Sequence, residues 1–317
     1  MMLAYTSDLF VLPLPEGHRF PMPKYRLLRE RVAAELPTAV QLAEAPAATE
    51  GELALAHEPV YVSAVLEGLL SPAAQREIGF PWSARMAERA RRSVGATIAA
   101  ARTALVQGVS ANLAGGTHHA SAEKGSGYCV FNDVAVAARL MQAEWHRRHR
   151  ALLRVLVIDL DVHQGNGTAA IFADDPTVFT FSMHGERNFP FRKAASDLDV
   201  ELPDGCGDEA YLGALDQAME AVWHRHEGRQ PGLAFYLAGA DPHENDRLGR
   251  LKLSAAGLAE RDRRVLNALR ERGIPVALSM AGGYGRDIHE TVAIQARTLA
   301  LAAESWRAWQ AMEQSPA

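Results

Sequence analysis

The stretch Val155–Thr168, read as VLVIDLDVHQGNGT, decides the fold. It opens with the apolar run Val155–Ile158, and such a run bounded by polar residues is typical of a buried parallel strand. Asp159, Asp161 and His163 follow at a spacing of two. Residues two apart on an extended chain point to the same face. Because ligands bind beyond the carboxyl ends of strands in open α/β sheets, the stretch predicts a strand that ends at a metal site.

The composition is that of a globular protein with a sizeable core. The chain has 317 residues, of which 48% are hydrophobic and 22% charged. No linker-like segment or charge run divides it, so we expect a single domain over residues 1–317. A formal net charge of −5 gives no basic footprint for nucleic acid. No apolar run suffices to span a membrane, the N-terminus does not resemble a signal peptide, and cysteines are few, which together predict a cytoplasmic protein.

Strands and helices alternate along the rest of the chain. Further strands are predicted at Ala4–Leu12, Ser110–Gly115, Thr177–Met183, Gly232–Ala238 and Pro275–Met280. Helices are predicted at residues 24–36, 59–68, 84–107, 132–145, 208–226, 254–272 and 288–312. This alternation predicts βαβ units and a parallel sheet with helices on both faces.

Polar side chains follow four of the predicted strands, two of them next to paired glycines. They are His118 and His119, Asp159 with Asp161 and His163, Asp241, and Tyr284. Because parallel strands all end at the same edge of a sheet, we expect these side chains to converge on one pocket.

The chemistry of these residue types predicts metal-assisted hydrolysis of an amide. A catalytic zinc site takes three protein ligands and leaves one position open, and Asp161, His163 and Asp241 supply two carboxylates and one imidazole. A metal ion lowers the pKa of its bound water and polarises a carbonyl group. Such a reaction also needs a general base, a general acid and a donor to the developing oxyanion.

Two adjacent histidines and one tyrosine can fill those roles. His118 and His119 can act as the acid–base pair. Asp159 can fix one of them in its tautomer and stabilise its charged form. Tyr284 can donate a hydrogen bond to the oxyanion.

The motifs resemble those of the histone deacetylase/acetylpolyamine amidohydrolase superfamily. The matching stretches are Gly115–His119, Gly127–Cys129, Asp159–Thr168, Ala238–Asp241 and Gly282–Tyr284. Three details resemble the class IV (eleventh-type) branch, namely Gln164, the run Asp246–Gly249 and the run Glu201–Pro203.

The resemblance implies an arginase/deacetylase α/β fold around an eight-stranded parallel sheet. It implies Zn²⁺ on Asp161, His163 and Asp241, with Fe²⁺ suited to the same ligands. It assigns His118 and His119 as the electrostatic and general acid–base pair, and Tyr284 as the residue that polarises the acyl oxygen. The implied substrate-binding residues are Gly127, Tyr128, Phe189 and Gly283. A structural K⁺ is implied near Asp159, Asp161, His163, Ser182 and Met183.

Two positions depart from the usual family pattern. Gln164 stands where most members have a second histidine, and strand parity puts it off the ligand face. Asn166 stands where some branches carry an aspartate behind the second histidine. A neutral amide orients His119 without stabilising its cation, so we expect His119 to be the better general base and His118, beside Asp159, to be more cationic.

The sequence therefore predicts a zinc-dependent amidohydrolase that removes acetyl or longer acyl groups from acyl-lysine in peptides or proteins. A deacetylase of small acylated amines such as polyamines is an alternative, although Leu248 stands where an acidic gate is expected. A binuclear arginase-like hydrolase would need more ligands, since Asn166 replaces one. A non-catalytic acyl-lysine binding protein is the alternative of another class. The sequence makes no prediction of oligomeric state.

Several polar residues have plainer interpretations. His57 and His184 are expected to have structural roles. Glu244, Asp246 and Arg247 are equally compatible with the mouth of the site and with a solvated loop.

Overall fold

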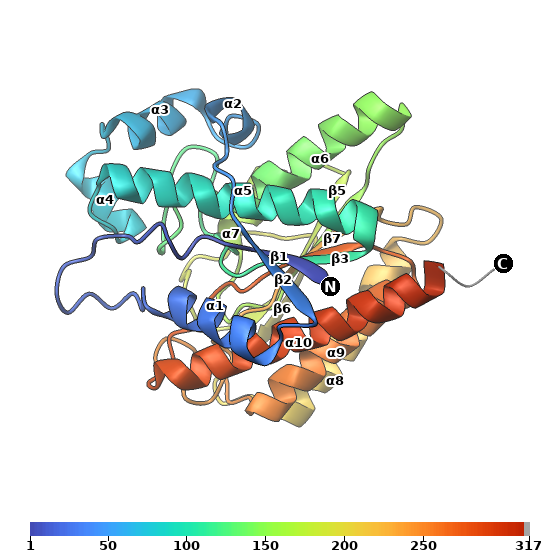
Figure 1. The fold of residues 1–317 in the computed structure, drawn as a ribbon. Coiled ribbons are helices and arrows are strands. Elements are labelled where there is room, and N and C mark those ends of the chain that lie inside the picture. The colour runs from blue at the N-terminus through green and yellow to red at the C-terminus, as the bar shows by residue number, and fades with distance from the viewer. Residues whose placement is uncertain (314–317) are drawn as a thin grey trace.

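The computed structural model describes residues 1–313, and its centre is one eight-stranded sheet (Figure 1). The strand order is β2-β1-β3-β8-β7-β4-β5-β6, and all neighbours are parallel. The strands are β1 (Met2–Thr6), β2 (Val40–Glu44), β3 (Val109–Asn112), β4 (Val155–Asp159), β5 (Val178–Gly185), β6 (Leu198–Leu202), β7 (Leu233–Leu237) and β8 (Val276–Ser279). The predicted parallel sheet and arginase/deacetylase-type architecture are confirmed.

Helices cover both faces of the sheet (Figure 1). One layer contains α2 (Glu50–Leu53), α3 (Pro59–Glu67), α4 (Pro72–Ile78), α5 (Ala84–Gln107), α6 (Asp133–His149) and α7 (Asn166–Phe172). The other contains α1 (Lys24–Glu35), α8 (Asp208–Arg225), α9 (Ala255–Glu271) and α10 (Ile288–Glu313). No helix among residues 1–313 is long and apolar enough to cross a membrane.

The central strand β4 shows why an apolar run folds at this place. Leu156 and Ile158 belong to the core under α8, α9 and α10, whereas Val155 and Val157 belong to the core under α5 and α6. Successive side chains of β4 therefore point alternately into the two cores, and both faces of the strand are buried. The carboxyl ends of β4 and its neighbour β7 lie side by side, with Asp159 paired to Leu237.

The sequence misplaced the first strand and missed the two edge strands. The first strand is Met2–Thr6 rather than Ala4–Leu12, because Thr6 Oγ1 donates to Asp8 (2.8 Å) and turns the chain out of the sheet. Leu9 and Val11 are then 68% and 52% exposed. β2 and β6 lie at the edges and mix polar with apolar residues, so they lack the apolar run of a central strand.

Most predicted helices agree with the structure. The helix predicted at residues 84–107 matches α5, and the others differ by one to four residues at their ends. The sequence missed α2, α4 and α7. The predicted single domain includes residues 314–317, which lie outside the described residues.

Candidate active site

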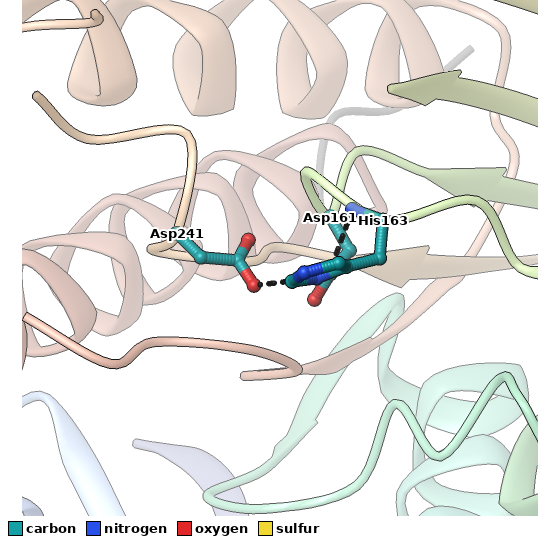
Figure 2. A group of neighbouring side chains, drawn as sticks. All are labelled: Asp161, His163 and Asp241. Atoms are coloured by element: carbon teal, nitrogen blue, oxygen red, sulfur yellow. Dashed lines mark hydrogen bonds and ion pairs between the residues drawn. The ribbon is translucent and has the colours of Figure 1, made fainter. Parts of the chain in front are cut away.

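Asp161, His163 and Asp241 meet at the carboxyl edge of the sheet (Figure 2). Asp161 and His163 follow β4, and Asp241 follows the adjacent strand β7. All three are buried, and their ligand-type atoms lie within 4.8 Å of one another. Nδ1 of His163 lies 3.0 Å from Oδ1 of Asp161 and 3.3 Å from Oδ2 of Asp241. Two carboxylates and one imidazole thus point at one place.

This convergence results from local hydrogen bonds between backbone amides and aspartate side chains, and not from a strand that continues to His163. β4 ends at Asp159, whose Oδ1 accepts the amide of Asp161 (3.1 Å). Oδ1 of Asp161 in turn accepts the amide of His163 (2.9 Å). The prediction of an extended chain through His163 is therefore wrong, because short-range side-chain acceptors turn the backbone there.

The donor set fits a divalent cation. Burial lowers the pKa of His163, but its hydrogen bonds and charge interactions with Asp161 and Asp241 outweigh this and raise the pKa to about 10. Burial and the nearby Asp161 charge raise the pKa of Asp241 to about 7. Among the described residues, Oδ2 of Asp241 has no better partner than Nδ1 of His163, 3.3 Å away. Two buried carboxylates this close together are stabilised by a nearby positive charge. Two carboxylates with one imidazole are suitable ligands for zinc.

The two adjacent histidines have different partners. Nδ1 of His118 lies 2.6 Å from Oδ2 of Asp159, and Nδ1 of His119 lies 2.7 Å from Oδ1 of Asn166. Burial lowers the pKa of His118, but the charges of Asp159 and Asp161 outweigh it and raise the pKa to about 9. Burial lowers the pKa of His119 well below its usual value, and the nearby His118 and His163 lower it further. These directions agree with the expectation from Asn166.

A buried aspartate fixes the loop that carries these histidines. Asp133, at the start of α6, accepts the amide of Gly116 (3.0 Å) at Oδ2 and that of Thr117 (2.8 Å) at Oδ1. The sequence analysis missed this residue. Its only sequence signal is an acidic side chain directly after the helix N-cap Asn132.

A second buried aspartate fixes Tyr284. Oδ2 of Asp246 accepts the amide of Tyr284 (2.6 Å), while its Oδ1 accepts the amides of Leu248 (2.8 Å) and Gly249 (2.9 Å). Asp246 is therefore neither a solvated loop residue nor a lining residue of the mouth. Burial raises the pKa of Tyr284 well above its usual value, so the phenol stays protonated.

An open cleft of about 710 Å³ leads to these groups. At its base it is lined by His119, His163, Asn166 and Tyr284, and on its walls by Gly127, Tyr128, Phe189 and Leu248. The Phe189 ring stands edge-on to His119, with 4.9 Å between the ring centroids.

The two glycines predicted to bind substrate lie differently relative to the cleft. Gly127 has φ +54°, and a Cβ there would lie 2.7 Å from Cδ2 of His119, so only glycine leaves this wall open. Gly283 is buried, and its carbonyl accepts Nζ of the buried Lys24 (3.2 Å). Gly283 is not among the residues that line the cleft.

The remaining predicted residues lie close by. Asp159 is the register partner of Ser182 in the β4–β5 ladder, and Met183 is the next residue of β5. Ser182 Oγ lies 2.9 Å from Nδ1 of His184, which is therefore not a ligand of the Asp161 group. Nε2 of His57 accepts the amide of Asn132 (2.8 Å), a structural role.

Gln164 points away from the ligand face, but strand parity is not the reason, because β4 ends at Asp159. Its Nε2 donates to the carbonyl of Ala194 (2.6 Å) and to Oδ1 of Asp199 (2.9 Å), and its Oε1 accepts the amide of Ala194 (2.9 Å). It thereby holds the loop that carries Phe189, a contact that the sequence did not indicate.

Comparisons with known proteins agree with this fold and site. The histone deacetylase domain matches residues 18–299. The chain belongs to the histone deacetylase family. That family is generally metal-dependent, and the group Asp161, His163 and Asp241 is a possible metal site in this member.

The relatives differ in how much of their length this chain covers. An uncharacterized protein of Picosynechococcus sp. is 48% identical over 294 residues, which cover 92% of this chain and 94% of that protein. Histone deacetylase 2 of Arabidopsis thaliana is 36% identical over 206 residues, which cover 64% of this chain and 51% of the plant protein. The crystal structure of a histone deacetylase homologue from Aquifex aeolicus aligns with a TM-score of 0.80 at 25% identity, covering 96% of this chain and 84% of that chain.

Proposed function

We propose that this chain is a zinc-dependent amidohydrolase that removes acetyl or longer acyl groups from acylated lysine. The proposal rests on one observation, the convergence of three kinds of group at one site. They are a set of two carboxylates and one imidazole, two histidines with different partners, and a tyrosine. The family and fold matches support deacetylase activity in general.

The proposed zinc ligands are Asp161, His163 and Asp241. Three protein ligands with one open position are typical of catalytic zinc, and Fe²⁺ suits the same set. When bound there, the ion would lower the pKa of a water molecule and polarise the acyl carbonyl. We also propose a structural K⁺ at the junction of β4 and β5, held by Asp159, Asp161, His163, Ser182 and Met183.

His119 is the proposed general base. Its pKa lies well below the usual value, so the imidazole is neutral at physiological pH and can take a proton from water. Asn166 orients the ring by accepting a hydrogen bond from Nδ1. His118, whose pKa is raised to about 9, keeps its charge and stabilises the negative charge that develops on the substrate. The histidine pair then protonates the departing amine.

Tyr284 is the proposed oxyanion donor. Its protonated phenol can donate a hydrogen bond to the acyl oxygen, where the charge grows as the carbonyl is attacked. Gly127, Tyr128 and Phe189 form the walls that enclose the acyl-lysine stem. Enclosure keeps the lysine in line with the reacting groups.

Turnover of a substrate panel tests the proposal. The panel contains lysine peptides acylated from acetyl to myristoyl, together with acetylated polyamines, each assayed with the metal-free and the zinc-loaded protein. We expect zinc-dependent release from lysine peptides. Turnover of polyamines alone would move the substrate to small metabolites, and no turnover of any acyl amine would refute the hydrolase.

The variant Tyr284→Phe separates the hydrolase from a binding protein. Loss of one oxyanion donor is expected to lower kcat by roughly 10²–10³, while an acyl peptide still binds, as measured by fluorescence anisotropy. Loss of binding in Tyr284→Phe, with no turnover in either the parent protein or the variant, would favour the non-catalytic alternative.

A further inference from the structure

Arginines are concentrated at the mouth of the cleft. The arginines that line the cleft are Arg76, Arg187 and Arg250. A second hollow of about 190 Å³, beside Tyr284, is lined by Arg19 and Arg247. The whole chain has a formal net charge of −5, so this positive rim is a local feature and does not follow from the composition.

Nearby carboxylates neutralise only part of this charge. Glu77 is the one carboxylate among the residues that line the cleft, and it lies 2.7 Å from Nζ of Lys124. Asp204 lies 3.1 Å from Arg250 and 3.9 Å from Arg187, so one acid is shared between two guanidinium groups. Within residues 1–313, Arg76 has no ion pair. The mouth therefore keeps net positive charge.

These arginines are available to a ligand. The side chains of Arg187 and Arg250 are 70% and 54% exposed. Arg76 comes from the last turn of α4, Arg187 from the loop after β5 and Arg250 from the loop after β7, so the charges surround the opening from three segments. Phe191, 87% exposed, adds apolar surface to the same mouth.

We propose that the mouth selects acylated lysines that lie in acidic peptide segments. This inference rests on the proposed function and specifies its substrate class. Guanidinium groups bind carboxylates in a bidentate geometry, so aspartates or glutamates on either side of the acyl-lysine meet opposite charges at the rim. A polyamine would bring further cations to the same place and be repelled.

Matched peptides with different flanking charges test this selectivity. All carry the same acyl-lysine, flanked by Asp and Glu, by Ala, or by Lys and Arg, and kcat/KM is measured at low and at high salt. We expect the acidic peptide to exceed the basic one by about tenfold or more at low salt, and the difference to shrink at high salt because exposed charges are screened.

Charge reversal assigns the effect to the rim. Arg76→Glu and Arg187→Glu are each expected to lower kcat/KM for the acidic peptide by about threefold to tenfold at low salt, with little change for the alanine-flanked peptide. Arg148→Glu is the matched control, because it makes the same charge change at an exposed position that does not line the cleft, fifteen residues and about 22 Å along α6 from Asp133.

The outcomes separate the two proposals. Hydrolysis of all three peptides with equal kcat/KM would overturn the selectivity and leave the hydrolase intact. Stronger competition by a single-stranded oligonucleotide than by an unacylated acidic peptide would also overturn it, since the rim would then select phosphates. Failure to hydrolyse any peptide would instead refute the function on which it rests.

Discussion

His118 and His119 are neighbours in sequence, yet the atoms behind them give them opposite protonation preferences. Asp159 raises the pKa of His118 to about 9 despite its burial. His119 has only the amide oxygen of Asn166, which orients the ring but carries no charge. Burial and the neighbouring imidazoles then dominate, and the pKa of His119 falls well below its usual value. His118 thus has a carboxylate partner that offsets its burial, whereas His119 has only a neutral amide that does not.

We predict that Asn166→Asp shifts the acidic limb of the kcat/KM profile to higher pH. A carboxylate 2.7 Å from Nδ1 stabilises the imidazolium and raises the pKa of His119. A general base works only when deprotonated, so activity would begin at a higher pH, by about one pH unit or more. The measurement is kcat/KM against pH for an acetyl-lysine peptide.

Asn166→Ala is the control for that shift. It removes the orienting acceptor without adding charge, so the plateau should fall while the acidic limb does not move to higher pH. An unmoved limb in Asn166→Asp would show that deprotonation of His119 does not limit the reaction.

At the scale of elements, loops that are distant in sequence hold the site through buried polar side chains. Asp133, Asp246 and Gln164 each bind backbone groups of another segment: the histidine loop, the Tyr284 loop and the Phe189 loop. The candidate catalytic and metal-binding side chains could be selected from the sequence, because their chemistry is unusual at strand ends. These three supports were not, because their partners are ordinary backbone amides or carbonyls that the sequence does not mark.

We predict that Gln164→Leu raises KM for acyl peptides more than it lowers kcat. The leucine leaves the amide and carbonyl of Ala194 and Oδ1 of Asp199 without this partner, while Oδ2 of Asp199 keeps the amide of Ser196. These groups are partly buried, so the loss of each hydrogen bond costs about 0.5–1.5 kcal/mol, which should loosen the loop that presents Phe189 to the cleft. Steady-state kinetics measure KM and kcat, and thermal unfolding measures stability.

Gln142→Leu is the matched control at the opposite end of the same strands. Gln142 donates to the carbonyl of Leu153, two residues before β4, and to Oγ1 of Thr177, directly before β5. We expect a similar loss of stability with an unchanged KM. An equal rise in KM for both variants would assign the effect to general destabilisation.

At the scale of the whole molecule, the sheet edges mark the limit of sequence-based prediction. The buried strands can be recognised in the sequence because both of their faces are apolar. In β4, for example, Leu156 and Ile158 are 0% exposed. The edge strands β2 and β6 pair on one side only and carry polar residues such as Gln41 and Glu201. These two segments form strands because they pair with the neighbouring strands β1 and β5, and the local sequence pattern does not show that pairing.

The proposed metal site would couple the stability of the fold to the binding of one ion. Burial and the charge of Asp161 raise the pKa of Asp241 to about 7, and hydrogen bonds to both acids raise that of His163 to about 10 after burial has lowered it. Protons therefore compete with a metal ion for these ligands, and binding should strengthen as pH rises. A ligand present at one hundred times its Kd stabilises the native state by about 2.7 kcal/mol.

We therefore predict that Zn²⁺ raises the Tm of the metal-free protein by roughly 5 °C, and more at pH 8 than at pH 6. Asp241→Asn keeps an oxygen to accept the amide of Val162, which Oδ1 of Asp241 accepts at 2.9 Å, but removes the buried charge. Its Tm without metal should equal or exceed that of the parent protein, because the repulsion with Asp161 is gone, and Zn²⁺ should no longer raise it. Differential scanning calorimetry measures both. An undiminished rise in Asp241→Asn would place the stabilising ion elsewhere on the molecule, and a rise with Mg²⁺ equal to that with Zn²⁺ would contradict a site that contains an imidazole ligand.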